Sequence, residues 1–196
     1  MESNSQTVIL GRDSLPSVIR LEGGESREVV FVAPKGVSGT FDVTFELAGP
    51  GAGLALYGIY LCEGEQKVDF RINVRHLCGG CTSHQLFKGL AQDSAQVKFE
   101  GLVYVAHGAE KTEALQENHS LLLSDRATVQ TQPQLEIYAD DVICSHGATV
   151  GALDEQQLYY MRSRGISLDL ARTLQITSFL SPVLEHLPED LVKEIL

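Results

Sequence analysis

Apolar and polar residues alternate in short runs, separated by glycines, through roughly the first three quarters of the chain. In the clearest run, residues 68–75, an apolar residue is followed by a polar or charged one at every step. Because successive side chains of a strand point to opposite faces, this run predicts a strand with one buried and one solvated face. Runs of this kind that carry β-branched or aromatic residues predict strands over 29–32, 41–47, 54–61, 68–74, 97–105 and 135–142.

The pattern changes to helical spacing after Leu153. Asp154 and Gln157 have the spacing of a capping box, and Gly165 suits the left-handed end of a helix, so a helix is predicted over 154–164. Short strands with no helix between them are typical of a sandwich, a barrel or a β-solenoid, and periodicity does not choose among these. We therefore expect a β core over 1–152 and a helical domain over 153–196.

Two further helices are predicted in the C-terminal segment. Ser167 is a suitable N-cap for the second, which Pro182 would end, and Pro188 could begin the third. The second helix would bury an apolar stripe formed by Leu170, Leu174 and Phe179.

The length, composition and charge of the chain argue against some classes of protein. The chain has 196 residues, 43% of them hydrophobic, and a net charge of −11, so it is long enough for a core and too acidic to favour a nucleic-acid partner. Its N-terminus lacks a signal-like pattern, and no apolar run is long enough to cross a bilayer. With only four cysteines, we expect reduced thiols and a cytoplasmic protein without membrane contact.

One cluster of candidate metal ligands follows the 68–75 run. His76, Cys78, Cys81 and His84 fall within nine residues, and Gly79 and Gly80 would allow the chain to turn between the cysteines. Two thiolates and two imidazoles suit tetrahedral zinc, and a Cys-x-x-Cys pair also suits redox chemistry. The alternative, without metal or redox chemistry, is a glycine-rich turn that happens to contain thiols.

A second cluster is Cys144-Ser145-His146. On a strand, Cys144 and His146 would share one face, where a thiol and an imidazole could both bind a soft metal. His119 is a third candidate ligand or base. Each of these residues could instead be a structural residue of the core.

The stretch from Leu135 to Ile166, which contains Cys-Ser-His-Gly-Ala-Thr, resembles the C-terminal signature of the SufB/SufD family. These proteins are scaffold subunits of the SUF iron–sulfur cluster assembly machinery. The segments 85–90, 99–105 and 111–125 resemble the core of the same family, and the first stretch is more similar to SufD than to SufB. The chain is shorter than typical members and would be a short member or a divergent paralogue.

The resemblance implies a mainly β fold, a right-handed parallel β-helix followed by a small α-helical domain. It implies a non-catalytic scaffold that pairs with a SufB-like subunit through its β-helix, with His146 at the interface. Cys144 and His119, which the residues themselves suggest, are further candidates for the cluster or the interface. Where SufB carries a sulfur-accepting cysteine, this chain has Asn118 and His119, which also favours SufD. An iron–sulfur cluster would be bound only transiently, and reduced flavin only within an assembled complex.

The resemblance further implies that the helical domain recruits a SufC-type ATPase. The candidate contacts are Tyr159, Arg162, Arg164, Leu174 and Phe179. Two alternatives stay open. One is a homodimer that pairs through the same edge, and the other is a stand-alone zinc or redox protein that uses the Cys78/Cys81 cluster.

Overall fold

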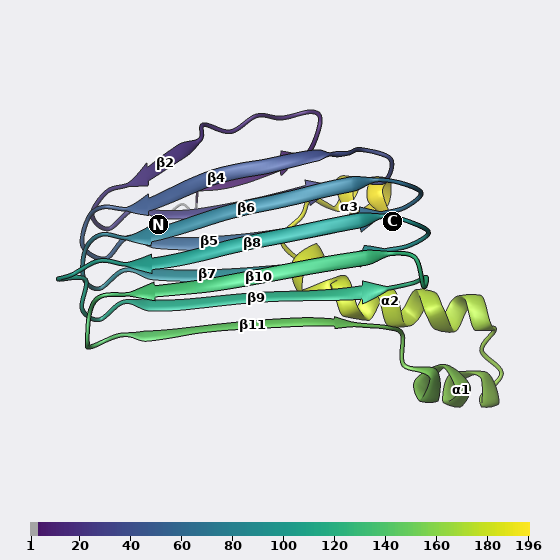
Figure 1. The fold of residues 1–196 in the computed structure, drawn as a ribbon. Helices are drawn as coiled ribbons and strands as arrows, with labels where there is room; N and C mark the ends of the chain where they lie inside the picture. Colours follow the sequence, from purple (N-terminus) through teal and green to yellow (C-terminus); the bar gives the residue numbers. More distant parts are fainter. Residues whose placement is uncertain (1–3) are drawn as a thin grey trace.

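The computed structural model describes residues 4–196, and strands account for about half of this part of the chain (Figure 1). The strands are β1 (Asn4–Ile9), β2 (Val18–Leu21), β3 (Ser26–Ala33), β4 (Gly39–Leu47), β5 (Gly53–Cys62), β6 (Lys67–His76), β7 (Thr82–Ala91), β8 (Gln96–Val105), β9 (Glu113–Leu122), β10 (Thr128–Ile137) and β11 (Ile143–Gly151).

The chain passes back and forth between two parallel sheets. Odd-numbered strands form one sheet in the order β1-β3-β5-β7-β9-β11, and even-numbered strands form the other in the order β10-β8-β6-β4-β2. Each strand pairs in parallel with the strand two positions later, as Phe70 of β6 does with Phe99 of β8. The fold is therefore a parallel β-solenoid of about five coils, which confirms the predicted fold class.

Inward-facing apolar side chains of the two sheets form the main core. The alternation over 68–75 is confirmed, because Val68, Phe70, Ile72 and Val74 are fully buried while the residues between them are not. An aromatic column runs along the interior, with ring centroids 5.2 Å apart for Phe41 and Phe70 and 5.6 Å apart for Phe70 and Phe87. Stacking of the coils thus forms a large interior core that extends from β1 to β8.

Three helices follow the last strand: α1 (Glu155–Ser163), α2 (Leu168–Leu184) and α3 (Glu189–Ile195). Asp154 caps α1 by accepting hydrogen bonds from two backbone N–H groups, and Ser167 caps α2, as predicted. Gly165 has the expected positive φ of 87°. In the part of the chain that the structure describes, no helix combines the length and the apolar character needed to span a membrane.

Helices α2 and α3 pack on the outer face of the odd-numbered sheet. Leu180 and Val183 of α2 and Leu191 of α3 form a second buried cluster with outward-facing residues of β3, β5 and β7, among them Val30, Ile59 and Leu86. This sheet is therefore buried on both faces where the helices cover it, whereas α1 projects beyond the solenoid (Figure 1). The division into two domains stays a prediction.

Three predicted details are wrong. The strand predicted over 135–142 ends at Ile137, because the chain turns before β11 begins at Ile143. Pro182 does not end α2, which continues to Leu184. Leu170 and Leu174 are 51% and 46% exposed, since α2 buries a different face that includes Ala171 and Leu180.

Candidate interaction site at the end of the solenoid

The last coil leaves the solenoid open at one end. Strands β10 and β11 are the terminal strands of their sheets, so each of them pairs with a described strand, β8 or β9, on one side only. We call β10 and β11 together the open end (Figure 1). The outer edge of such a strand presents N–H and C=O groups to which another strand can bind.

Strands β10 and β11 also carry exposed apolar side chains. Ile137 continues the inward-facing column of Val105 but is 40% exposed, because no described coil covers it. Val150 continues the column of Ser120 and is 42% exposed, and Ile143 on the outer face is 72% exposed. The open end therefore has the composition of an unfinished core rather than of a solvated cap.

Two of the predicted site residues lie together on the inward face of β11. Cys144 is in register with buried Ala114, and His146 is in register with buried Gln116. Cys144 is half-buried and packs against the small cluster around Val103, and burial raises the pKa of its thiol. His146 is exposed. A thiol and an imidazole thus face the mouth of the open end, two residues apart on one strand.

His119 is on the other face of the sheet. It is in register with Thr149, and its Nδ1 lies 2.8 Å from the Thr149 hydroxyl. Its Nε2 lies 3.6 Å from the Glu117 carboxylate. The structure therefore brings Cys144 and His146 together and separates both from His119.

A buried polar column leads to this pair, and sequence reasoning missed it. Gln85, Gln116 and His146 occupy successive rungs of the odd-numbered sheet, and Gln116 Nε2 donates to Gln85 Oε1 over 3.2 Å. Asn118, also buried, donates to Thr131. Gln116 Oε1 and Asn118 Oδ1 have no hydrogen-bond partner among residues 4–196. The polar residues at alternate positions 116, 118 and 120 were the signal that could have revealed it.

The predicted zinc ligands do not come together. His76 is buried at the end of β6, where its Nε2 lies 2.9 Å from the Ser83 hydroxyl and burial lowers its pKa to about 4. His84 lies on the outer face of β7, beside Tyr57. Within residues 4–196, no group of three or more His, Cys, Asp or Glu side chains could hold a metal ion. Of the four predicted ligands, Cys78 and Cys81 remain as a pair in the turn between β6 and β7.

The predicted ATPase contacts are distributed over α1 and α2. Tyr159, Arg162, Arg164 and Leu174 are exposed, Tyr159 to 74%. Phe179 is half-buried and stacks under the Lys88 ammonium, whose nitrogen is 4.7 Å from the ring centroid. A shallow groove bordered by Leu153, Met161, Leu174 and Phe179 separates the two helices. Phe179 thus belongs to the interface of α2 with the sheet as much as to the exposed surface.

Comparison with known proteins identifies the family of the chain. A family model described as the SUF system FeS cluster assembly SufBD core domain matches residues 26–179. The chain belongs to the SufBD family. This confirms the resemblance that the residues of the open end and of α1 carry.

Two curated relatives match much of this chain. It is 40% identical over 149 residues to the iron–sulfur cluster assembly protein SufD of Escherichia coli, across 76% of the chain. It is 40% identical over 179 residues to the protein ABCI7, chloroplastic, of Arabidopsis thaliana, across 90% of the chain. The chain spans 35% and 37% of the length of these two relatives. The cytoplasmic location stays a prediction.

Proposed function

We propose that this chain is a non-catalytic, SufD-like scaffold in iron–sulfur cluster assembly, which pairs with a SufB-like subunit through its open end. The observation that carries the proposal is the inward-facing pair of Cys144 and His146 on a terminal strand with a free edge. Family membership supports the assembly role, and the name of the E. coli relative states that role for that protein.

The ligand count favours a shared site. Thiolates and imidazoles are both iron ligands, but Cys144 and His146 supply only two of the four donors of a tetrahedral site. Since the described residues offer no group of three or more ligands, the remaining donors would come from a partner seated on the open end. The iron–sulfur cluster would then be a substrate that is bound at the interface between the two chains.

A strand-edge partner suits the geometry of the open end. An antiparallel or parallel strand laid along β11 would satisfy its free N–H and C=O groups and cover Ile143 and Val150. Tyr159 and Arg162 of α1, Arg164 just after it and Leu174 of α2 would meanwhile be available to a SufC-type ATPase. Flavin binding by the assembled complex stays a prediction.

The proposal is tested by co-expressing the chain with a SufB-like subunit and a SufC-type ATPase. The expected result is a complex that copurifies, and that loses the SufB-like subunit but keeps the ATPase when Ile143 is replaced by Lys. A homodimer in place of the complex would favour the alternative of self-pairing. A chain that binds neither protein would overturn the proposal.

A further inference from the structure

Cys78 and Cys81 are the two corner residues of a tight turn between β6 and β7. Gly79 and Gly80 are its central residues, and Gly80 has a φ of 69°. A positive φ at the third residue is typical of a type II β-turn, in which the first and last Cα atoms lie within about 7 Å. A disulfide needs a Cα separation of about 4.4–6.8 Å, so this turn sets the spacing that a disulfide requires.

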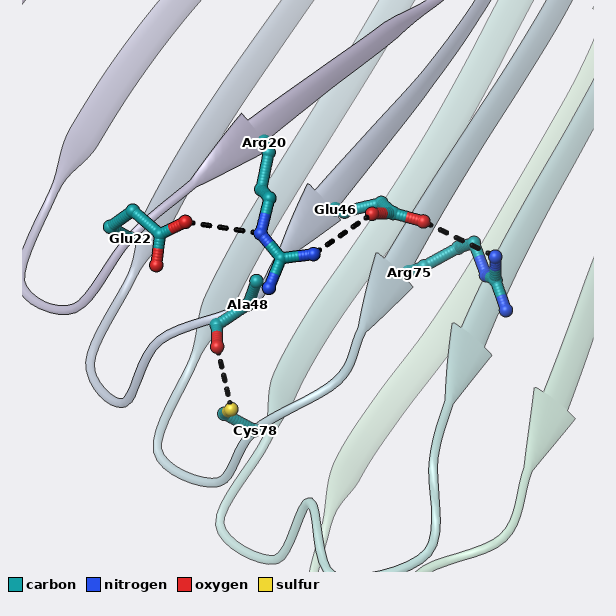
Figure 2. Close-up of polar contacts among 6 residues, drawn as sticks. All are labelled: Arg20, Glu22, Glu46, Ala48, Arg75 and Cys78. Atoms are coloured by element: carbon teal, nitrogen blue, oxygen red, sulfur yellow. Dashed lines mark hydrogen bonds and ion pairs between the residues drawn. The ribbon is translucent and has the colours of Figure 1, made fainter.

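Both thiols point to the same side of this turn. The Cys78 thiol donates to the Ala48 carbonyl over 2.9 Å, as Figure 2 shows, and the Cys81 thiol lies 3.3 Å from the carbonyl oxygen of Gly49, the next residue. Both sulfurs therefore face the same neighbouring turn of the chain. Burial raises the pKa of the Cys81 thiol, and the Cys78 sulfur beside it raises that pKa further.

The turn is held in this shape by its neighbours. A methyl group on Gly79 would lie 2.8 Å from the Glu110 carbonyl oxygen, and Gly80 N–H donates to that same oxygen over 2.9 Å. Only glycine therefore fits at the position between the cysteines that touches the next coil. The pairing geometry is built into the stacking of the coils and does not depend on a mobile loop.

The two thiols differ in access. Cys81 is fully buried, whereas Cys78 is half-buried at the rim of the core. A small oxidant would thus reach Cys78 first. Cys62 and Cys144, the other thiols of the chain, lie on β5 and β11, away from this turn.

We infer that Cys78 and Cys81 form a reversible disulfide on exposure to peroxides. The Cys78 thiolate attacks one oxygen of hydrogen peroxide, which breaks the O–O bond, gives a sulfenic acid on Cys78 and releases water after proton uptake. The Cys81 sulfur then attacks the Cys78 sulfur, and the hydroxyl group leaves as a second water with the Cys81 proton. The two sulfurs lose two electrons, and one peroxide is reduced. A small thiol reductant returns both cysteines to thiols.

This inference is tested on the purified full chain by peroxide treatment, alkylation of the remaining thiols and mass spectrometry. Trypsin releases residues 76–88 as a peptide that contains Cys78 and Cys81 and neither of the other cysteines. The expected result is a peptide lighter by two hydrogens that resists alkylation and becomes alkylatable after reduction. Two alkylated cysteines in peroxide-treated protein, or a disulfide between two chains, would overturn the inference.

Single substitutions test the order of the steps. In Cys81→Ser, we expect a sulfenic acid that accumulates on Cys78 and reacts with dimedone. In Cys78→Ser, we expect Cys81 to stay reduced under the same treatment, and its rapid oxidation would refute the order given above. Cys144→Ser is the matched control, because it removes a half-buried thiol outside the turn and should leave the disulfide unchanged. Circular dichroism checks that each variant keeps its strand content.

Discussion

The amide of Gln116 in β9 fills the space that Gly101 in β8 leaves open. A methyl group on Gly101 would lie 2.5 Å from Gln116 Nε2 and 2.6 Å from the Phe99 ring. Gly101 and Gln116 lie opposite each other on the two facing sheets, at the level where the interior changes from aromatic to polar residues. The amide of this buried glutamine also donates to Gln85 on the neighbouring strand β7.

Gly101→Ala should therefore destabilise the solenoid. The added methyl must displace either Gln116 or Phe99 in a packed interior, which costs roughly 1–3 kcal/mol of the free energy of unfolding. Urea denaturation at neutral pH measures this loss. Gly151→Ala is the control, because nothing in residues 4–196 lies within 4 Å of a methyl group there, and it should change stability by less than about 0.5 kcal/mol. Equal stabilities of the two variants would contradict the close packing of Gly101.

Sequence patterns predicted β6, which has one solvated face, and missed β7 and β9 for two different reasons. β6 alternates along its length and was found, whereas β7 is buried on both faces because α2 covers it, so Leu86, Phe87 and Leu90 leave little alternation to read. β9 was missed for the opposite reason, since its inward positions include Gln116 and Asn118. In both strands, the contacts that decide the pattern come from segments distant in the sequence, α2 for β7 and the neighbouring coils for β9, and are invisible in the local sequence.

The candidate site shows a similar limit. Two-residue spacing correctly placed Cys144 and His146 on one face of a strand, because that relation is local. Sequence proximity wrongly suggested that His76 and His84 could share a metal with the cysteines between them. The turn sends His76 to the interior and His84 to the outer face of the opposite sheet, and only the register of the coils determines this.

His76 should make stability depend on pH. Burial lowers its pKa to about 4 in the folded chain, against about 6.5 when unfolded, so between these values the unfolded chain binds the extra proton. Stability due to neutral His76 is complete above about pH 6.5 and falls by up to about 3 kcal/mol as the pH drops towards 4. Urea denaturation of wild type and His76→Gln across this range measures the difference. His107→Gln, in an exposed turn, should keep the wild-type pH dependence, and an unchanged slope in His76→Gln would contradict the assignment.

Substitutions of Leu180 and Leu174 in α2 should affect different properties. The first should lower the stability of the fold, and the second should weaken partner binding. Leu180 is fully buried against the sheet, so Leu180→Ala should cost about 2–5 kcal/mol of the free energy of unfolding. Leu174 is 46% exposed, so Leu174→Ala should cost less than about 1 kcal/mol while weakening the proposed ATPase contact. Thermal unfolding and a pull-down with a SufC-type ATPase measure the two effects. If Leu174→Ala binds the ATPase as well as the wild type does, Leu174 is not part of the interface.

Ile143 should be required for pairing at the open end. It is 72% exposed on a terminal strand, so Ile143→Lys should not affect folding, but it would place a charge on a surface that the proposed partner strand covers. We expect roughly a tenfold or greater loss of affinity for a SufB-like subunit, measured by calorimetry. Val18→Lys is the matched control, since Val18 is a 52% exposed apolar residue on β2, at the opposite end of the other sheet. If Val18→Lys weakens binding and Ile143→Lys does not, the partner occupies the other end of the solenoid.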